Sequence, residues 1–489
     1  MKLPILNFTD FYKVDHKRQY PEGTSMVYSN FTPRGSRMPG VNEVVVFGVQ
    51  YFLKEFLVKQ FNETFFNQPK ETVVNAYKRR MDTALGPNNV GTAHLEALHD
   101  LGYLPLEIKA LREGTVAPIK VPVLTIKNTK AEFYWLPNFL ETLLSDTLWH
   151  PMTSATIAFE YHKLLNQYAK DTSDMLDFVQ WQAHDFSMRG HTSLESSVMS
   201  GAAHLLSFTG TDTIPSIDFH EQYYNANSEK ELIGGSVPAT EHSVMCAGGE
   251  LNETDTFKRL INEVYPTGIV SIVSDTWDYW NTLTNIVPSL KEDIMKRDGK
   301  VVIRPDSGDP VKVICGDPNA RPGSPERLGS IQVLWNTFGG TTNSKGFKQL
   351  DSHIGLIYGD SITIERASVI LRQLKDMGFA STNVVFGVGS YTYQHVTRDT
   401  LGFAMKATYA VVNEKGVEIY KNPKTDDGVK KSAKGLLRVG YDLDNNIVLE
   451  DQQTEFEEKG GLLKTVFLNG KLTSETSLSE IRNRLKGTL

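Results

Sequence analysis

The second half of the chain alternates short apolar runs with longer amphipathic stretches. Four apolar runs, each with an acidic or glycine-rich tip, begin at Val270, Val301, Ile354 and Val384. Amphipathic helical stretches separate these runs, at residues 277–296, 326–338 and 363–379. Short β-branched strands that alternate with helices are typical of parallel βα units whose sheet is buried on both faces. The pattern therefore predicts a parallel sheet whose strands all end at one edge.

The two ends of the chain follow a different pattern. Residues 106–130 have the composition of strands, and short strand-like runs return after residue 400. A helical region at 135–176 precedes the alternating part, which starts near residue 180. We predict an α/β fold: an irregular α/β barrel-like catalytic domain, and a β-rich domain formed from the N- and C-terminal segments. The expected domains are 151–390 for the barrel and 1–150 with 391–489 for the β-rich part.

Composition narrows the class of protein only slightly. The 489 residues suffice for two or three domains, and 40% hydrophobic and 22% charged residues are ordinary. A formal net charge of -7 gives no reason to expect nucleic acid or a membrane as partner, so any phosphate site needs locally clustered Lys and Arg. Two cysteines are too few for a disulfide framework, and no apolar run reaches membrane-spanning length. We expect a cytoplasmic protein.

The run that begins at Val301 leads into the turn Arg304-Pro-Asp-Ser-Gly-Asp-Pro310. Proline and glycine bracket this turn, which fixes Arg304 and Asp306 relative to each other. Arg304 can grip a phosphate as a planar fork. Asp306 can hold a ribose diol or, through water, a magnesium ion. The alternative is a solvated turn with a local Asp–Arg pair.

Two more aspartates occupy equivalent positions, Asp275 after the first run and Asp360 after the third. A single aspartate at a strand end is most often a helix N-cap, but barrel topology would bring three of them together. The fourth run ends in Gly387-Val-Gly-Ser390, whose backbone N–H groups can cradle a phosphate, although a plain turn is the alternative. Together these tips predict a site for a phosphorylated, metal-bound substrate.

Three upstream segments add an aromatic ring, an arginine, an aspartate and a histidine. They are His184-Asp-Phe-Ser-Met-Arg189, Phe208-Thr-Gly-Thr-Asp-Thr213 and Ser236-Val-Pro-Ala-Thr-Glu-His-Ser243. Taken singly, each has an ordinary explanation: a core phenylalanine, an Asx turn or a surface histidine.

Taken in order, these segments make the chain similar to the nicotinamide phosphoribosyltransferase family, a branch of the type II phosphoribosyltransferases. Ten motifs in family order are far more specific than any one of them, and they span nearly the whole chain. They are Tyr12-Lys-Val, Tyr134-Trp-Leu, His184-Asp-Phe-x-x-Arg-Gly190, Gly210-Thr-Asp-Thr213, Ser236-Val-Pro-Ala-x-Glu-His-Ser243, Val273-Ser-Asp275, Ile303-Arg-Pro-Asp-Ser-Gly308, Gly359-Asp360, Phe386-Gly-x-Gly389 and Thr397-Arg-Asp399.

The resemblance implies an enzyme of NAD salvage, a pentosyltransferase that uses Mg²⁺. It would condense nicotinamide with phosphoribosyl pyrophosphate to give nicotinamide mononucleotide and pyrophosphate. It also implies residues for the ribose, the metal and the phosphates. The catalytic group would be Arg304, Asp306, Asp360, Asp275 and His242, with Asp306 and Asp360 near the metal, directly or through water or substrate. The phosphate-binding group would be Gly359, Gly389, Ser390, Arg398, Lys406 and Lys430, with Arg34 and Lys421 at the pyrophosphate end.

For the base, the resemblance implies a pyridine ring stacked between Phe186 and Tyr12 of the partner subunit, with Ser271 nearby. This arrangement implies a homodimer with active sites at the subunit interface. Arg189 would donate to the amide carbonyl, and Asp212 would accept from the amide NH₂ and repel nicotinate. His242 matches a histidine that takes a phosphoryl group from ATP, so ATP is expected as an activating co-substrate.

The sequence departs from the family pattern at three places. These departures are expected to change the affinity for ligands more than the reaction that is catalysed. Gly355 stands where a basic residue is expected, the glycine loop is short, and Met188 replaces a bulkier aromatic residue before Arg189. The alternatives are a nicotinate or quinolinate phosphoribosyltransferase, or a non-catalytic regulatory protein on the same fold. Asp212 argues against an acid substrate. Retention of Arg304, Asp306, Asp360 and His242 argues against a binding scaffold.

Overall fold

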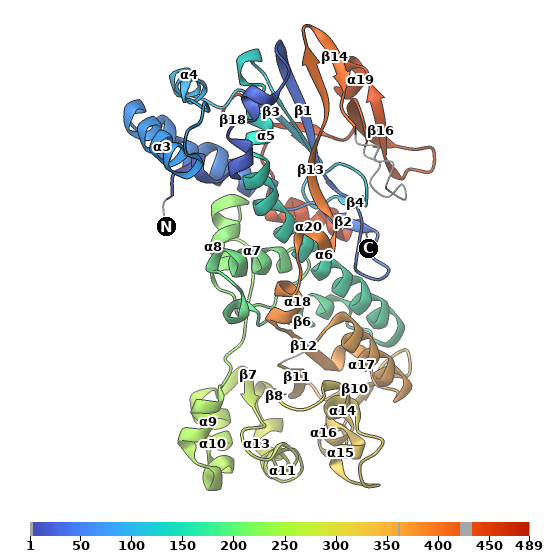
Figure 1. Ribbon diagram of the computed structural model, residues 1–489. Helices are drawn as coiled ribbons and strands as arrows, with labels where there is room; N and C mark the ends of the chain where they lie inside the picture. Colours follow the sequence, from blue (N-terminus) through green and yellow to red (C-terminus); the bar gives the residue numbers. More distant parts are fainter. Residues whose placement is uncertain (1–2, 360–361, 421–432, 489) are drawn as a thin grey trace. The chain divides into compact units, whose positions relative to one another are not determined.

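The chain folds into two compact units in the computed structural model, which describes residues 3–359, 362–420 and 433–488 (Figure 1). Unit 1 comprises Met1–Thr156, His220–Ala226 and Val396–Leu489, and unit 2 comprises Ile157–Phe219 and Asn227–His395. Unit 1 is rich in β-strands from both ends of the chain, and unit 2 alternates strands with helices. The predicted α/β class with β-rich terminal segments is confirmed.

Unit 1 is organised around a seven-stranded sheet in the order β14-β13-β1-β5-β3-β17-β18, with every pair antiparallel. Its two longest strands, β1 (Thr24–Pro33) and β13 (Phe403–Val412), are paired with each other, so the two ends of the chain share one sheet. The other members are β3 (Leu106–Ala110), β5 (Leu124–Asn128), β14 (Lys415–Glu418), β17 (Lys464–Leu468) and β18 (Lys471–Leu472).

Smaller elements complete unit 1. Two short pairs lie outside the main sheet: β2 (Glu43–Val45) with β4 (Val116–Pro118), and β15 (Leu436–Tyr441) with β16 (Ile447–Gln453). The helices are α1 (His16–Gln19), α2 (Val49–Tyr51), α3 (Lys70–Leu85), α4 (Ala93–Leu101), α5 (Leu136–Phe139), α19 (Glu455–Glu458), α20 (Leu478–Lys486) and the first part of α6 (Glu141–Thr172). π-Helical segments occupy Phe52–Gln60 and Asn62–Phe66.

A buried carboxylate explains why His220–Ala226 belongs to unit 1. Glu113 is 6% exposed and accepts hydrogen bonds from the backbone N–H groups of Gly48 (3.0 Å) and Gln50 (2.6 Å). The Tyr224 hydroxyl donates to the same carboxylate at 2.9 Å. Burial raises the pKa of Glu113 to about 7, although these hydrogen bonds act in the opposite direction.

This raised pKa predicts a pH-dependent stability. Between the ordinary carboxyl pKa of 4.5 and the folded value of about 7, the folded chain holds a proton that the unfolded chain has lost. The free energy of unfolding should therefore fall as pH rises through this window. Urea denaturation across the window should show a smaller fall for Glu113→Gln, while the exposed control Glu22→Gln should follow the wild type. Equal falls in all three proteins would contradict the prediction.

Unit 2 contains a parallel five-stranded sheet in the order β6-β12-β11-β8-β7. Its strands are β6 (Ala183–Asp185), β7 (Thr267–Val273), β8 (Asp298–Arg304), β11 (Ile354–Tyr358) and β12 (Val384–Val388). Isolated parallel bridges join Asp185 to Thr211, Gly210 to Gly235, and Ala239 to Ser271. These isolated bridges extend the parallel pairing beyond β6 and β7, so the sheet is curved and barrel-like, as predicted.

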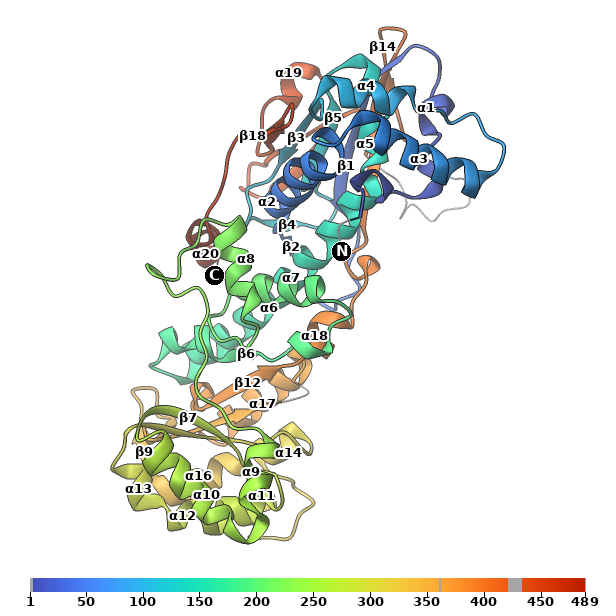
Figure 2. The same cartoon turned by 90° about the vertical axis from the view of Figure 1, so that its left-hand side faces the viewer.

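Helices surround this barrel, and Figure 2 shows α9–α13 gathered on the side of β7. The α-helices of unit 2 are the later part of α6, α7 (Leu194–His204), α8 (Pro215–Tyr223, whose last turn lies in unit 1), α9 (His242–Gly248), α10 (Glu253–Arg259), α11 (Tyr279–Asn281), α12 (Val287–Ser289), α13 (Lys291–Met295), α14 (Pro310–Cys315), α15 (Pro325–Leu328), α16 (Ser330–Phe338), α17 (Ile364–Asp376) and α18 (Ser390–Gln394). A short hairpin, β9 (Gly340–Thr342) with β10 (Lys348–Leu350), lies apart from the barrel sheet.

Two predicted helices differ from the structure. The single helix expected at 326–338 is wrong: α15 and α16 are separated at Gly329, whose φ of 79° lies in the left-handed region. A Cβ there would also lie 2.4 Å from the backbone nitrogen of Gly316. The helix expected at 277–296 is a series of short pieces, including a π-helical segment at Thr282–Ile286.

No helix among the residues described here combines the length and apolar character that crossing a membrane requires.

Candidate functional site

The parallel barrel brings the predicted strand-end residues to one edge of unit 2. Arg304 is the last residue of β8, Gly359 follows β11, and Gly389 follows β12. Asp275 lies two residues beyond the end of β7, and Asp185 ends β6. Since neighbouring strands are paired in parallel, their carboxyl ends lie next to one another.

Asp275 holds the turn that carries Asp306. Its Oδ2 accepts hydrogen bonds from the backbone N–H of Asp306 at 2.8 Å and of Ser307 at 2.7 Å, and from the Ser307 hydroxyl at 2.6 Å. On the other side, the buried Tyr358 hydroxyl lies 2.9 Å from the carbonyl oxygens of Ser307 and Gly308. The turn after β8 is therefore held from two neighbouring strands, and Asp275 has a supporting position.

His242 lies beside this turn, at the first residue of α9. Its Nε2 is 3.9 Å from both Asp275 Oδ1 and Asp306 Oδ2, and its Nδ1 is 3.1 Å from the Thr276 hydroxyl. The side chain is 49% exposed. An imidazole held through Nδ1 can present the exposed Nε2 to a ligand.

Arg304 and Gly359 complete the group around Asp306. Arg304 donates through Nη2 to the carbonyl of Thr240, and its buried Nε has no hydrogen-bond partner within the described ranges. A Cβ on Gly359 would lie 2.0 Å from Asp306 Oδ1, so only glycine allows this carboxylate its position. The next predicted residue, Asp360, lies outside the described residues.

A second feature of unit 2 is a cavity of about 560 Å³ next to β6. Its lining residues are Phe186, Met188, Arg189, His191, Ser193, Leu194 and Asp212. Three residues predicted to bind the base, Phe186, Arg189 and Asp212, therefore share one cavity. Its volume is in the range of small-molecule pockets.

Asp212 presents an ionised carboxylate to this cavity. Its Oδ1 lies 2.8 Å from His184 Nε2 and accepts a hydrogen bond from the Ser236 hydroxyl at 2.6 Å. Burial acts to raise the pKa of Asp212, but the hydrogen bonds from His184 and Ser236 outweigh it, so the pKa lies below its usual value. An ionised carboxylate only accepts hydrogen bonds, which suits a ligand with N–H donors.

At this edge of unit 2, the phosphate-binding prediction concerns Gly389 and Ser390. Ser390 begins α18, with Gly389 as N-cap, and a Cβ on Gly190 would lie 2.0 Å from Ser390 Oγ. This close approach joins the glycine turn after β12 to the segment that carries Arg189. Ser271 was predicted at the base: it is buried on β7, and its Oγ has no hydrogen-bond partner in the part of the chain described here.

Four predicted residues, Tyr12, Arg34, Arg398 and Lys406, belong to unit 1. Burial lowers the pKa of the Lys406 ammonium, and Arg34 and Arg398 lower it further although Glu141 opposes them. The charges of Arg34 and Arg398 therefore both act on Lys406 within unit 1. Lys421 and Lys430, which were predicted to join them, fall outside the described residues.

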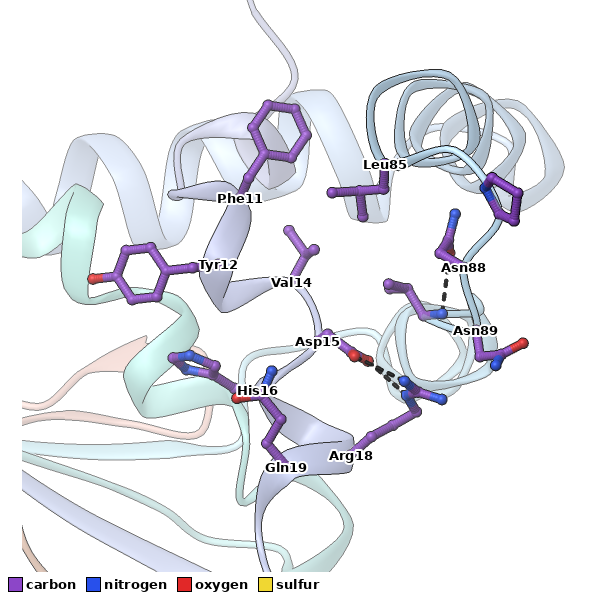
Figure 3. Close-up of a pocket in the computed structure, with 12 residues that line it drawn as sticks. Phe11, Tyr12, Val14, Asp15, His16, Arg18, Gln19, Leu85, Asn88 and Asn89 are labelled. Carbon is purple, nitrogen blue, oxygen red and sulfur yellow. Dashed lines mark hydrogen bonds and ion pairs between the residues drawn. The ribbon is translucent and has the colours of Figure 1, made fainter.

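Tyr12 is exposed in unit 1, beside a cavity of about 530 Å³ (Figure 3). Figure 3 shows Tyr12 on the side of His16 and turned away from Leu85. Its ring meets the His16 ring edge-on at 5.5 Å, and the Lys13 ammonium lies 4.9 Å from its centre. Lys13 is in turn paired with Glu141 at 2.6 Å, so Tyr12 is held at the surface.

A lysine on the neighbouring strand lies beside Gly355, the position where the family pattern has a basic residue. A Cβ on Gly355 would lie 3.1 Å from the Lys300 Cδ, so the Lys300 side chain on β8 occupies the space beside this glycine on β11. Burial lowers the pKa of the Lys300 ammonium. A neighbouring strand thus supplies a basic group where residue 355 does not.

Several residues of these sites had no role in the sequence analysis. His184, Ser236, Ser307 and Tyr358 form the hydrogen bonds described above. Their only sequence signal was their place within or next to the motifs. No group of three potential His, Cys, Asp or Glu metal ligands occurs among the described residues, to which Asp360 does not belong.

Two sequence models of known families together match most of the chain. The sequence model of the nicotinate phosphoribosyltransferase (NAPRTase) family matches residues 181–471. The model described as nicotinamide phosphoribosyltransferase, N-terminal domain, matches residues 4–107.

Curated relatives are similar over nearly their full length. A nicotinamide phosphoribosyltransferase of Acinetobacter baylyi is 55% identical, over 98% of this chain and 96% of the relative. A nicotinamide phosphoribosyltransferase of Mycoplasma pneumoniae is 37% identical, over 85% of this chain and 92% of the relative.

Solved structures share the fold at low identity. The nicotinate-nucleotide pyrophosphorylase of Pyrococcus furiosus has a TM-score of 0.59 and 15% identity, over 99% of this chain and 95% of that one. Human nicotinic acid phosphoribosyltransferase has a TM-score of 0.55 and 13% identity, over 98% and 93%. At these identities the likeness concerns the fold alone.

Proposed function

The chain belongs to the nicotinamide phosphoribosyltransferase family, and from this premise we propose that it condenses nicotinamide with phosphoribosyl pyrophosphate to give nicotinamide mononucleotide and pyrophosphate. The observation that carries the choice of base is the ionised Asp212 carboxylate in the cavity that Phe186 and Arg189 also line. A primary amide can donate N–H to this carboxylate, whereas the carboxylate of nicotinate would be repelled.

The chemistry asked of the second group of residues is electrostatic. Displacement at the anomeric carbon builds positive charge on the ribose while negative charge leaves with pyrophosphate. Asp306, held by the Asp275 turn, is suited to the ribose hydroxyls, and Arg304 to the phosphates. Gly389 and Ser390 begin a helical turn at the strand end, and we propose that they receive the 5′-phosphate.

We propose Mg²⁺ as cofactor, held near Asp306 and Asp360. The donor set fits in one respect: Asp306 is partly exposed, and the buried Asp275 Oδ1 has no hydrogen-bond partner among the described residues. Mg²⁺ usually binds one or two carboxylates and completes its shell with water and substrate phosphates. Bound there, the ion would neutralise charge on the leaving pyrophosphate.

We propose that ATP stimulates the reaction through phosphorylation of His242, whose exposed Nε2 lies beside Asp275 and Asp306. Replacing His242 by alanine is expected to abolish the increase in nicotinamide mononucleotide formation that ATP causes, because the phosphoryl acceptor is gone. The rate without ATP should change far less. Rates measured with and without ATP check this, and full ATP stimulation in His242→Ala would contradict it.

We propose a homodimer, because the predicted residues fall into two sets: the base and ribose residues in unit 2, and Tyr12 with the cations Arg34, Arg398 and Lys406 in unit 1. If the unit 1 set completes a partner's site, Tyr12→Ala and Phe186→Ala damage opposite halves. Each variant alone should raise the KM for nicotinamide about tenfold through lost ring stacking. Co-expression of the two variants should produce mixed dimers in which one site has a KM for nicotinamide near the wild-type value. Phe186→Ala expressed alone should form no such site.

The deciding experiment is product analysis with purified protein, phosphoribosyl pyrophosphate and Mg²⁺, with nicotinamide or nicotinate as base. We expect nicotinamide mononucleotide and pyrophosphate from the amide and little product from the acid. Preferred use of nicotinate would favour a nicotinate phosphoribosyltransferase. Absence of pyrophosphate with either base would favour a regulatory protein on this fold. Two free cysteines, one of them exposed, suit a reducing compartment, so we place the reaction in the cytoplasm.

A further inference from the structure

We propose that His184 is a positioning residue for base selection: it holds the Asp212 carboxylate and the Phe186 ring in the arrangement that distinguishes an amide from an acid. This inference rests on the proposed function and assigns a new role within that site. His184 lies on β6, its Nε2 is 2.8 Å from Asp212 Oδ1, and its ring centre is 4.5 Å from that of Phe186. One side chain therefore contacts both the polar and the aromatic wall of the cavity.

His184 has little room to move. It is 8% exposed, and a Cβ on Gly210 would lie 2.8 Å from its Nδ1. On the other side, β12 pairs Gly387 with His184, and a Cβ on Gly387 would lie 2.8 Å from Phe186 Cδ2. Gly210 therefore leaves room for the His184 ring, and Gly387 leaves room for the Phe186 ring. A larger residue at either glycine would displace one of these rings.

The backbone reinforces the same arrangement. The Asp212 N–H donates to the Asp185 carbonyl at 2.9 Å, and the Asp185 N–H donates to the Gly210 carbonyl at 3.1 Å. The buried Asp185 carboxylate in turn accepts from the Thr213 hydroxyl at 2.7 Å. The segment that carries Asp212 is therefore joined to the strand that carries His184 on both sides of the pair.

The contact with His184 decides which oxygen of Asp212 is free. Oδ1 accepts hydrogen bonds from His184 and from Ser236, whereas Oδ2 accepts none within the described ranges. A carboxylate with one oxygen occupied can use the other to accept an N–H of a primary amide. Without His184, the Asp212 carboxylate loses a contact that fixes its orientation, so it can turn away from the cavity, where the amide loses its acceptor and the acid meets less repulsion. Loss of His184 should therefore weaken amide binding and relax the discrimination against nicotinate.

Three variants test this role: His184→Phe removes the donor and keeps a ring, His184→Gln keeps a donor near the Nε2 position, and His353→Phe is the control. His353 forms a similar pair, with Nδ1 2.6 Å from Asp351 Oδ1, but it precedes β11 at the opposite end of the strand from the site. We expect His184→Phe to raise the KM for nicotinamide about tenfold, as loss of a hydrogen bond to a charged group does. The KM for phosphoribosyl pyrophosphate should stay unchanged, His184→Gln should restore most of the loss, and His353→Phe should match the wild type.

A double-mutant cycle separates positioning from a general structural effect. In an Asp212→Asn background, the further change His184→Phe should have little effect on the KM for nicotinamide, because its contact partner has already changed. The ratio of kcat/KM for nicotinamide to that for nicotinate should fall about tenfold in His184→Phe alone.

Equal increases in both KM values, an unchanged preference between the two bases, or full additivity with Asp212→Asn would overturn the proposal. Those results would leave the proposed function intact, because the wild-type protein would still form nicotinamide mononucleotide. A wild-type protein that makes no product would instead reject the proposed function, and with it the role of His184.

Discussion

Replacing Gly359 by alanine is expected to lower kcat/KM by about a hundredfold, because small displacements of a catalytic group have effects of this size. The new Cβ would lie 2.0 Å from Asp306 Oδ1 and 3.6 Å from Arg304 Cδ. The first distance is far below any van der Waals contact, so either the Asp306 carboxylate or the chain after β11 has to move. Gly359 has no unusual φ, which means that the cost is steric and is confined to the site.

A matched glycine separates this effect from a general loss of stability. A Cβ on Gly487, at the end of α20, would meet only the carbonyls of Arg484 and Asn483, at 3.5 Å and 3.6 Å. Gly487→Ala should therefore keep wild-type kinetics. Thermal unfolding followed by circular dichroism should give Gly359→Ala a melting temperature close to that of the wild type. Wild-type kcat/KM in Gly359→Ala would show that Asp306 does not need its observed position.

Replacing Asp275 by alanine is also expected to lower kcat/KM by about a hundredfold, although Asp275 need not touch the substrate. Its Oδ2 is the acceptor for two backbone N–H groups and one hydroxyl of the turn that carries Asp306. Alanine would leave these three donors without their acceptor, so the turn should shift toward water. The loss should appear mainly in kcat, since the turn and not the base cavity is disturbed.

Asp309 offers a control in the same loop. It accepts from the backbone N–H groups of Val311 and Lys312 as the N-cap of α14, so Asp309→Ala should cost about 1 kcal/mol of stability with little change in kcat. Adding Asp275→Ala to an Asp306→Ala protein should cause little further loss, because Asp275 acts through Asp306. Independent, additive losses would instead assign Asp275 a direct role.

Asp275 and Gly359 both fix the position of the Asp306 carboxylate, one from beyond β7 and the other from beyond β11. Asp275 reaches Asp306 across 31 residues of sequence from β7, and Gly359 leaves space for it from β11. The position of Asp306 is therefore a property of three neighbouring strands, and Tyr358 adds a hydroxyl beneath the same turn. Substitutions at any of these points should lower activity in the same way.

Much of the fold could be predicted because its signals are local. The apolar runs at Val270, Val301, Ile354 and Val384 became β7, β8, β11 and β12, since β-branched runs bounded by turn residues specify buried strands. The break at Gly329 and the three-residue strand β6 were missed. A helix can continue through glycine or end there, and three residues are too few to show a periodicity.

The sequence by itself determined the alternation of strands and helices, the strand-end placement of Arg304, Asp306 and Asp275, and, through ordered motifs, the family. The tertiary structure alone decided which of these residues meet. His184 reaches Asp212 across 28 residues, and Ser236 reaches it across 24, so neither contact leaves a trace in local periodicity. The physical reason is that hydropathy patterns record which face of an element is buried, whereas hydrogen bonds between elements depend on strand order and register.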